Sequence, residues 1–290
     1  MSADSSAQVL RLEDGRCLGF AEWGDPAGTP VLHFHGSSSS RLERPADLGS
    51  LESVRLVTVD RPGHGLSDFQ PDRRLLDWPS DVTALADHLG IDSFAVAGWS
   101  FGGPYALVCA RTIPQRLSGV AVVSSFAPHD RPGSTADMAR FNKVALGLAR
   151  RAPWWLARRL MGIQGKALTD RPEETAKRML SSLPDVDRRV LEEPAVSDVL
   201  IPAMTEAYRS GADGPAWEGR MMVRPWGFEL SEIGLPIQIW HGDTDVNNPL
   251  QSATYLQETL PESRATILEG EGHFHIFKYW GAILDQLTHT

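Results

Sequence analysis

Short, nearly continuous apolar runs alternate with amphipathic stretches along much of the chain. The runs lie at residues 31–35, 54–59, 94–97, 120–123 and 237–240. Such runs are typical of strands that are buried on both faces of a parallel sheet. Helices are predicted between them at 79–89, ending before Gly90, and at 103–112, ending before Pro114. The alternation predicts an α/β fold with a doubly wound, mostly parallel sheet.

The alternation is interrupted between about Phe126 and Gly234, where the pattern becomes helical and irregular. Residues 126–235 carry 16 Lys and Arg against 15 Asp and Glu, whereas the rest of the chain carries 12 against 22. This shift in composition indicates an insertion. We therefore predict a core made of residues 1–130 and 230–290, and a helical cap at 131–229. Extra helices packed on the sheet without a functional role are the alternative.

Composition excludes several classes of protein. A hydrophobic content of 42% with 22% charged residues is ordinary for a globular chain. A net charge of −9 disfavours nucleic acid as a partner. The two cysteines provide neither a disulfide framework nor a thiolate metal site. The first residues do not resemble a signal peptide, and no apolar run is long enough to span a membrane, so we expect a cytoplasmic protein.

The strongest chemical signal is the segment Gly98-Trp-Ser-Phe-Gly102, which fits Gly-x-Ser-x-Gly. It directly follows the apolar run 94–97 and directly precedes the helical segment 103–110, which is the strand–turn–helix setting of a nucleophile elbow. Such a turn strains the serine backbone, and the flanking glycines leave room for close approach. A tight turn with a surface serine is the structural alternative.

Four further segments match motifs of the α/β-hydrolase family in the order that this family has them. The chain therefore resembles that family over its whole length except the insertion. The segments are His35-Gly-Ser37, Asp60-Arg-Pro-Gly-His-Gly-Leu-Ser67, His241-Gly-Asp-Thr-Asp245 and Gly270-Glu-Gly-His273. The resemblance implies an oxyanion loop, a glycine-rich turn, an acid loop and a histidine loop respectively. The order Ser, Asp, His is the one that this fold uses.

The resemblance implies a role for each site residue. Ser100 would be the nucleophile, His273 the general acid and base, and Asp245 the carboxylate that orients the imidazole. The backbone N–H groups of Ser37 and Phe101 would stabilise an oxyanion.

Two further residues compete for these positions. Asp243 competes with Asp245, and the family's Gly-x-x-Asp spacing from Gly242 selects Asp245. His275 competes with His273, which the family places immediately after the glycine turn.

These features predict a serine hydrolase that cleaves a carboxylic ester or related acyl bond of a small, partly apolar substrate through an acyl-enzyme. No cofactor or metal is implied, since no metal-ligand spacing occurs. A C–C bond hydrolase, an aminopeptidase, a thioesterase or a perhydrolase would keep the same triad, and a non-catalytic small-molecule receptor is the rival from another class.

Large adaptable side chains in the insertion predict an apolar substrate pocket. The candidates are Trp154, Trp155, Met221, Met222 and Trp226. The same side chains could instead form the core of the cap and its contact with the sheet.

Overall fold

A single eight-stranded sheet organises the residues that the computed structural model describes, which are 6–128, 138–181 and 183–289. Its order is β1-β2-β4-β3-β5-β6-β7-β8. The strands are β1 (Gln8–Arg11), β2 (Cys17–Gly24), β3 (Thr29–Phe34), β4 (Val54–Val59), β5 (Phe94–Trp99), β6 (Leu117–Val123), β7 (Ile237–Gly242) and β8 (Ser263–Leu268). β2 pairs antiparallel with β1 and β4, and the remaining neighbours are parallel. The predicted mostly parallel sheet is confirmed.

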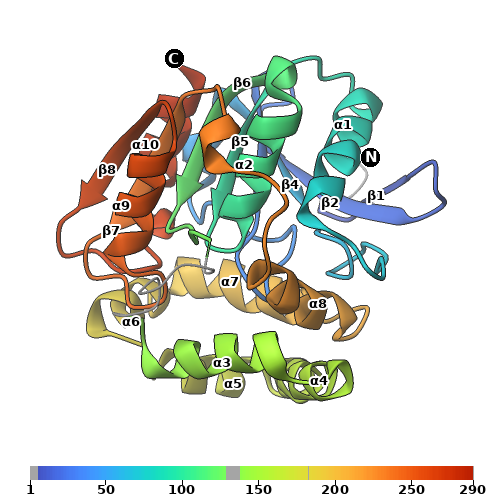
Figure 1. The fold of residues 1–290 in the computed structure, drawn as a ribbon, viewed down its shortest axis with the longest axis vertical. Coiled ribbons are helices and arrows are strands. Elements are labelled where there is room, and N and C mark those ends of the chain that lie inside the picture. The colour runs from blue at the N-terminus through green and yellow to red at the C-terminus, as the bar shows by residue number, and fades with distance from the viewer. Residues whose placement is uncertain (1–5, 129–137, 182, 290) are drawn as a thin grey trace.

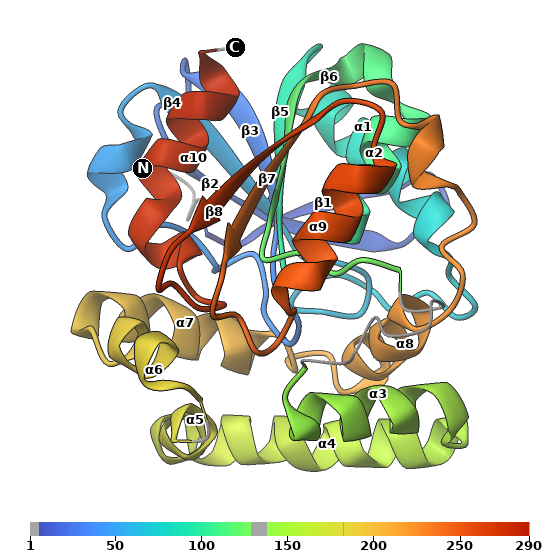
Figure 2. The ribbon, with the colours of Figure 1, turned by 60° about the vertical axis from the view of Figure 1, so that its left-hand side comes forward.

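Helices cover both faces of the sheet (Figures 1 and 2). Helices α1 (Trp78–His88), α2 (Gly102–Thr112) and α9 (Leu250–Thr259) pack on one face, and α10 (Ile276–Thr288) packs on the other. Short 3₁₀ helices lie at Leu48–Leu51, Leu75–Asp77, Pro114–Arg116 and Leu230–Glu232. The two helices predicted from the sequence are present within one residue of their predicted bounds. The doubly wound arrangement is therefore confirmed.

A helical insertion lies between β6 and β7, as predicted. It comprises α3 (Arg140–Arg151), α4 (Trp154–Asp170), α5 (Pro172–Leu180), α6 (Asp185–Leu191), α7 (Pro194–Glu206) and α8 (Asp213–Met222). Figures 1 and 2 place α7 and α8 next to the sheet and α3, α4 and α5 farther out. The predicted boundary at residues 130 and 131 lies outside the described residues, so the division into core and cap stays a prediction. Among the described helices, none has the length and hydropathy needed to cross a bilayer.

Three strands were not predicted, and all of them lie at or near an edge of the sheet. β1 alternates between half-buried and exposed residues, and β8 has no fully buried residue. β2 is better buried but contains two glycines. Half-exposed edge strands do not need the continuous apolar run that identifies a central strand of a parallel sheet. The pattern that revealed the central strands therefore could not reveal these.

Candidate active site

Ser100 lies in the tight turn that joins β5 to α2. Its φ is +53°, in the left-handed region that residues with a Cβ atom rarely occupy. A Cβ atom at Gly98 would lie 2.2 Å from the carbonyl oxygen of Gly102, and one at Gly102 would lie 1.9 Å from that of Phe34. Only glycine fits at both positions. Backbone packing therefore holds the serine in its strained conformation at the end of β5.

Loops that follow β5, β7 and β8 bring Ser100, Asp245 and His273 together. Nε2 of His273 lies 3.0 Å from Oγ of Ser100, and Nδ1 of His273 lies 2.7 Å from Oδ2 of Asp245. All three residues are at most 5% exposed. A hydroxyl, an imidazole and a carboxylate in this order can transfer the hydroxyl proton to the imidazole and stabilise the imidazolium that results.

Surrounding groups fix both partners of the imidazole–carboxylate pair. Oδ1 of Asp245 accepts hydrogen bonds from the backbone N–H groups of Asn247 and Asn248, each at 2.8 Å. The carbonyl oxygen of His273 accepts a hydrogen bond of 3.1 Å from the indole N–H of Trp99. Because these groups are already in place, little reorganisation is needed when charge develops.

The competing residues of the two loops have different contacts. Asp243 is exposed, and its Oδ1 accepts a hydrogen bond of 2.8 Å from the N–H of Gly270. His275 is buried with Nδ1 2.9 Å from the carbonyl oxygen of Gly272, and burial lowers its pKa to about 4. The geometry therefore favours Asp245 and His273, the pair that the loop spacing selects.

Carboxylates control the charge of the His273 imidazole. Burial disfavours its charged form, but Asp245 and, to a smaller extent, Asp187 outweigh burial and raise the pKa of His273 above its ordinary value. Burial also opposes ionisation of Asp245, whereas His273 and the hydrogen bonds that Asp245 accepts lower the pKa of its carboxyl. The ionised form of Asp245 is therefore favoured, and His273 binds a proton more readily than a free imidazole does.

Asp187 of α6 was missed by the sequence analysis. It is fully buried, and its Oδ1 accepts a hydrogen bond of 2.9 Å from the N–H of Phe274. A Cβ atom at Gly272 would lie 2.3 Å from the same oxygen. Burial raises the pKa of Asp187, and Oδ2 has no hydrogen-bond partner among the described residues. The helical insertion thus places a carboxylate against the loop that carries His273, and nothing in the local sequence separates Asp187 from the exposed Asp185.

The backbone around Ser37 is anchored by a buried arginine. Nη2 of Arg61 donates to the carbonyl oxygen of Gly36 at 3.0 Å, and Nη1 donates to that of His35. Because C=O and N–H point in opposite directions across a trans peptide, the first bond aims the N–H of Ser37 away from Arg61. The N–H of Phe101 lies at the start of α2, where backbone N–H groups lack an intrahelical partner.

Arg61 also connects this loop to the cap and to α2. Glu218 of α8 accepts a hydrogen bond of 2.8 Å from Nη2 of Arg61 and one of 2.9 Å from the hydroxyl of Tyr105 in α2. Burial would raise the pKa of Glu218, but the Arg61 guanidinium outweighs burial and lowers it. The sequence contained no signal for this buried ion pair, because its partners are 157 residues apart.

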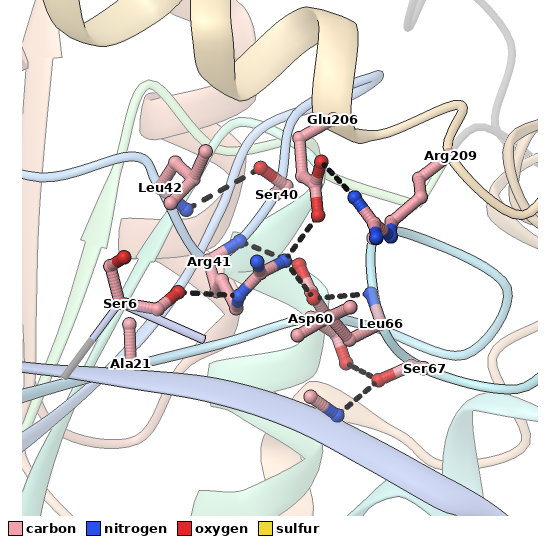
Figure 3. A network of polar contacts seen from close by, with 12 residues as sticks. Ser6, Ala21, Ser40, Arg41, Leu42, Asp60, Leu66, Ser67, Glu206 and Arg209 are labelled. Atoms are coloured by element: carbon pink, nitrogen blue, oxygen red, sulfur yellow. Dashed lines mark hydrogen bonds and ion pairs between the residues drawn. The ribbon is translucent and has the colours of Figure 1, made fainter. Parts of the chain in front are cut away.

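A second network joins the turn after β4 to helix α7 of the cap (Figure 3). Asp60 accepts hydrogen bonds from the backbone N–H groups of Arg41 and Leu66, at 2.7 and 2.8 Å. Nη1 of Arg41 lies 2.9 Å from Oδ2 of Asp60 and 2.8 Å from Oε1 of Glu206. The helical insertion therefore contacts the rest of the chain through two ion pairs, Arg61 with Glu218 and Arg41 with Glu206.

The five predicted pocket residues fall into two groups. The inner group is buried in the hydrophobic cluster that α1 and α2 form on the sheet, and it consists of Met221, Met222 and Trp226. Trp154 packs on Phe69 and on Trp217 of α8, and Trp155 is 65% exposed. The inner group shares its cluster with Phe101, which follows Ser100.

Within the described ranges, no three His, Cys, Asp or Glu side chains gather so that they could hold a metal ion. Two buried histidines other than His273 have partners of their own. Nε2 of His33 lies 2.7 Å from Oε1 of Glu43, and Nε2 of His241 lies 2.7 Å from the carbonyl oxygen of Asn248.

Known proteins with similar sequences or structures were found by comparison. The acetyltransferase component of the acetoin cleaving system of Pseudomonas putida is 35% identical over 113 residues, which are 38% of this chain and only 30% of that protein. A proline iminopeptidase of Neisseria gonorrhoeae is 24% identical over 91% of this chain and 89% of its own length. The crystal structure of an esterase from Rhodococcus sp. ECU1013 aligns with a TM-score of 0.68 and 22% identity, over 98% of this chain and 99% of that one.

The family comparison covers most of the chain. The model described as the alpha/beta hydrolase fold matches residues 29–278, which span the elbow, the acid loop, the histidine loop and the helical insertion. The chain therefore belongs to the α/β-hydrolase fold family.

Proposed function

We propose that this protein is a serine hydrolase that cleaves a carboxylic ester or related acyl bond of a small, partly apolar substrate. The observation that carries the proposal is the buried relay in which His273 lies 3.0 Å from Oγ of Ser100 and 2.7 Å from Oδ2 of Asp245. Ser100 is the proposed nucleophile, His273 the acid and base, and Asp245 its partner.

In the first half of the reaction, Oγ of Ser100 attacks the carbonyl carbon while its proton moves to Nε2 of His273. The carbonyl oxygen becomes an oxyanion that the N–H groups of Ser37 and Phe101 stabilise, and one such donor is worth on the order of 10²–10³ in rate. His273 then gives the proton to the leaving alcohol as the C–O bond breaks. The product of this half is an acyl-enzyme on Ser100.

In the second half, water takes the place of the alcohol. His273 removes a proton from the water as its oxygen attacks the acyl carbon, and the same N–H groups stabilise the second oxyanion. The proton then returns from Nε2 to Oγ of Ser100 as the acid product leaves.

The experiment that tests the proposal combines turnover with covalent labelling. We expect p-nitrophenyl acetate, butyrate, octanoate and dodecanoate to be hydrolysed with many turnovers per chain. A fluorophosphonate should label Ser100, as mapped by mass spectrometry. At most one slow event per chain would instead indicate a receptor, and a label on another residue would contradict the assignment of Ser100.

An iminopeptidase is the second candidate, because similarity to the Neisseria gonorrhoeae enzyme extends over 91% of this chain. The same relay could cleave an amide, but a free amino terminus in the substrate would need a carboxylate to receive it. Prolyl p-nitroanilide separates the candidates. A kcat/KM for the anilide above that for every ester would replace the esterase proposal with the peptidase.

The pH dependence of kcat/KM should show the raised pKa of His273, which the carboxylates of Asp245 and Asp187 cause. The imidazole must be neutral to accept the serine proton, so activity rises as pH rises through its pKa. Because that pKa is raised above 6.5, we expect the acid limb of kcat/KM above pH 6.5. Asp187→Asn keeps an oxygen for the Phe274 N–H but removes a negative charge, so the limb should move to lower pH.

Asp185→Asn is the matched control, since Asp185 lies on the same helix with its side chain 78% exposed. The measurement is kcat/KM for one ester from about pH 5 to pH 9. An unchanged limb in Asp187→Asn, or an equal displacement in Asp185→Asn, would contradict the role of Asp187.

Substrate selectivity should depend on the inner group of cap residues. Met222→Ala should alter the ranking of the four esters by tenfold or more, since one methylene in an apolar pocket is worth about 1–3 kcal/mol. It should also lower the free energy of unfolding by about 2–5 kcal/mol, because Met222 is only 1% exposed.

Trp155→Ala is the comparison, because this side chain is mostly exposed. Its ester ranking should match that of the unmodified protein, and its stability should change by about 0.5 kcal/mol or less. A uniform loss of activity for all four esters in Met222→Ala would assign Met222 to the cap core alone.

A further inference from the structure

The outer face of the cap differs from the rest of the molecule in both charge and hydrophobicity. Between residues 140 and 166 the sequence has seven Lys and Arg and no Asp or Glu, although the whole chain has a net charge of −9. All seven basic residues are exposed. The segment comprises α3 and most of α4.

Exposed apolar side chains are concentrated on the same two helices. Eight large hydrophobic side chains are exposed in the described residues, and five of them lie on α3 and α4. They are Val144, Leu148, Trp155, Leu160 and Ile163. Such a concentration on one part of a surface is typical of an interaction site rather than of scattered surface residues.

Helical spacing places four of the seven basic residues and four of the five exposed apolar residues in one stripe on each helix. In α4, Trp155, Arg159, Ile163 and Lys166 follow one another at intervals of four, four and three residues. In α3, residues 140, 144, 148 and 151 repeat the same intervals and are Arg, Val, Leu and Arg. The stripe on α4 therefore alternates apolar and basic side chains, and the stripe on α3 has an arginine on each side of two apolar side chains.

These helices form the layer of the cap that is farthest from the sheet (Figures 1 and 2). α3 packs on α8, and α4 packs on α5, α7 and α8. Among the described residues, the five apolar side chains named above are exposed on these two helices. A surface hollow of about 400 Å³ opens on α4 and is lined by Trp154, Trp155, Arg158, Arg159, Gly162 and Ala212. Guanidinium and indole groups together suit a phosphate that is attached to an apolar chain.

We propose that the face formed by the exposed residues of α3 and α4 docks on the surface of a bilayer that contains anionic phospholipid. Basic side chains would meet the phosphates, and Trp155, Ile163, Val144 and Leu148 would enter the boundary between headgroups and acyl chains. Arginine and lysine near an anionic leaflet each contribute to attraction, and Trp side chains favour the interface.

Charge and hydrophobicity together distinguish the bilayer from other occupants. Of the seven basic residues, Arg158 is paired with Asp213 and Lys166 with Asp170. In a symmetric dimer through this face, the excess of positive charge that the other five give would meet an excess of the same sign. A nucleic acid backbone would match the charge but would leave Trp155 and Ile163 in water. An anionic bilayer matches the positive charge and also takes up the exposed apolar side chains. Contact with its surface requires no membrane-spanning helix.

The test is cosedimentation of the full chain with vesicles of phosphatidylglycerol mixed with phosphatidylcholine, against vesicles of phosphatidylcholine alone. We expect binding to the anionic vesicles only, weakening as salt is raised. Arg151→Glu combined with Arg159→Glu should lower the partition coefficient by about thirtyfold or more. Ile163→Ser should lower it by about threefold or more at unchanged charge.

The control variants lie on β8, an edge strand of the sheet. Arg264→Glu and Ile267→Ser change an exposed arginine and an isoleucine that is 44% exposed, and both variants should bind as the unmodified chain does. Thermal unfolding of every variant checks that the fold is retained.

Several outcomes would overturn the proposal. These are no binding to anionic vesicles, equal binding to neutral ones, or equal losses in the α3–α4 variants and in the β8 controls. A dimer that forms without lipid and is abolished by Ile163→Ser would assign this face to a second copy of the chain. Because binding is measured without substrate, failure here leaves the hydrolase proposal untouched.

Discussion

Replacement of Ser100 with alanine is expected to lower kcat for p-nitrophenyl esters by about 10⁵–10⁶-fold and to abolish fluorophosphonate labelling. The change removes the only atom that the relay can activate, since Nε2 of His273 lies 3.0 Å from Oγ of Ser100. Secondary structure and unfolding temperature should be retained, because the variant keeps the Cβ atom and the same φ of +53°. Single-turnover and steady-state assays measure the loss.

Ser124→Ala is the matched control for this variant. Ser124 is a buried serine beside the site whose hydroxyl donates to the carbonyl oxygen of His273 at 3.1 Å, not to Nε2. Its loss should reduce kcat by about tenfold or less, as expected for one supporting hydrogen bond. Substantial activity in Ser100→Ala, or a loss of equal size in Ser124→Ala, would remove Ser100 from the reaction.

Asp245→Asn is expected to lower kcat by about 10⁴-fold, the size known for the corresponding change in a serine protease. The amide oxygen should stay with the N–H groups of Asn247 and Asn248, which donate to Oδ1 at 2.8 Å. The NH₂ group must then face Nδ1 of His273 in place of Oδ2. A donor there favours the tautomer that is protonated at Nε2, which cannot accept the serine proton.

Asp243→Asn tests the alternative in the same loop. Asn can keep the hydrogen bond that Asp243 accepts from the N–H of Gly270, so kcat should change by about threefold or less. The measurement is kcat for one ester in both variants at a pH above the acid limb. Equal losses, or a larger loss in Asp243→Asn, would exchange the roles of the two aspartates.

The parts of this protein that could be predicted from the sequence depend on local geometry. Apolar runs predict central strands because both faces of a parallel sheet are covered by helices. Gly98 and Gly102 predict the elbow because close backbone approach excludes any Cβ atom there. Gly242 and Gly270–Gly272 identify loops whose spacing selects Asp245 and His273, and the structure brings these two side chains to 2.7 Å from one another.

The cap residues could not be assigned in this way, because the same side chain can serve several purposes. Met222 and Trp155 have the same predicted role in the sequence, yet one is 1% and the other 65% exposed. Which side of a helix faces the sheet depends on how α4 and α8 pack, and packing is decided by contacts between residues far apart in the chain.

The sequence by itself determined the fold family, the elbow and the two loops that supply Asp245 and His273, since each is specified by neighbouring residues. Only the tertiary structure decided that Asp187 lies against the loop that carries His273 and that Glu218 pairs with Arg61, which binds the carbonyl oxygen of Gly36. Aspartate and glutamate are ordinarily exposed, and burial becomes favourable only when a distant donor or cation is brought to them. Whether such a donor or cation is near depends on the folded chain, so the local sequence cannot indicate it.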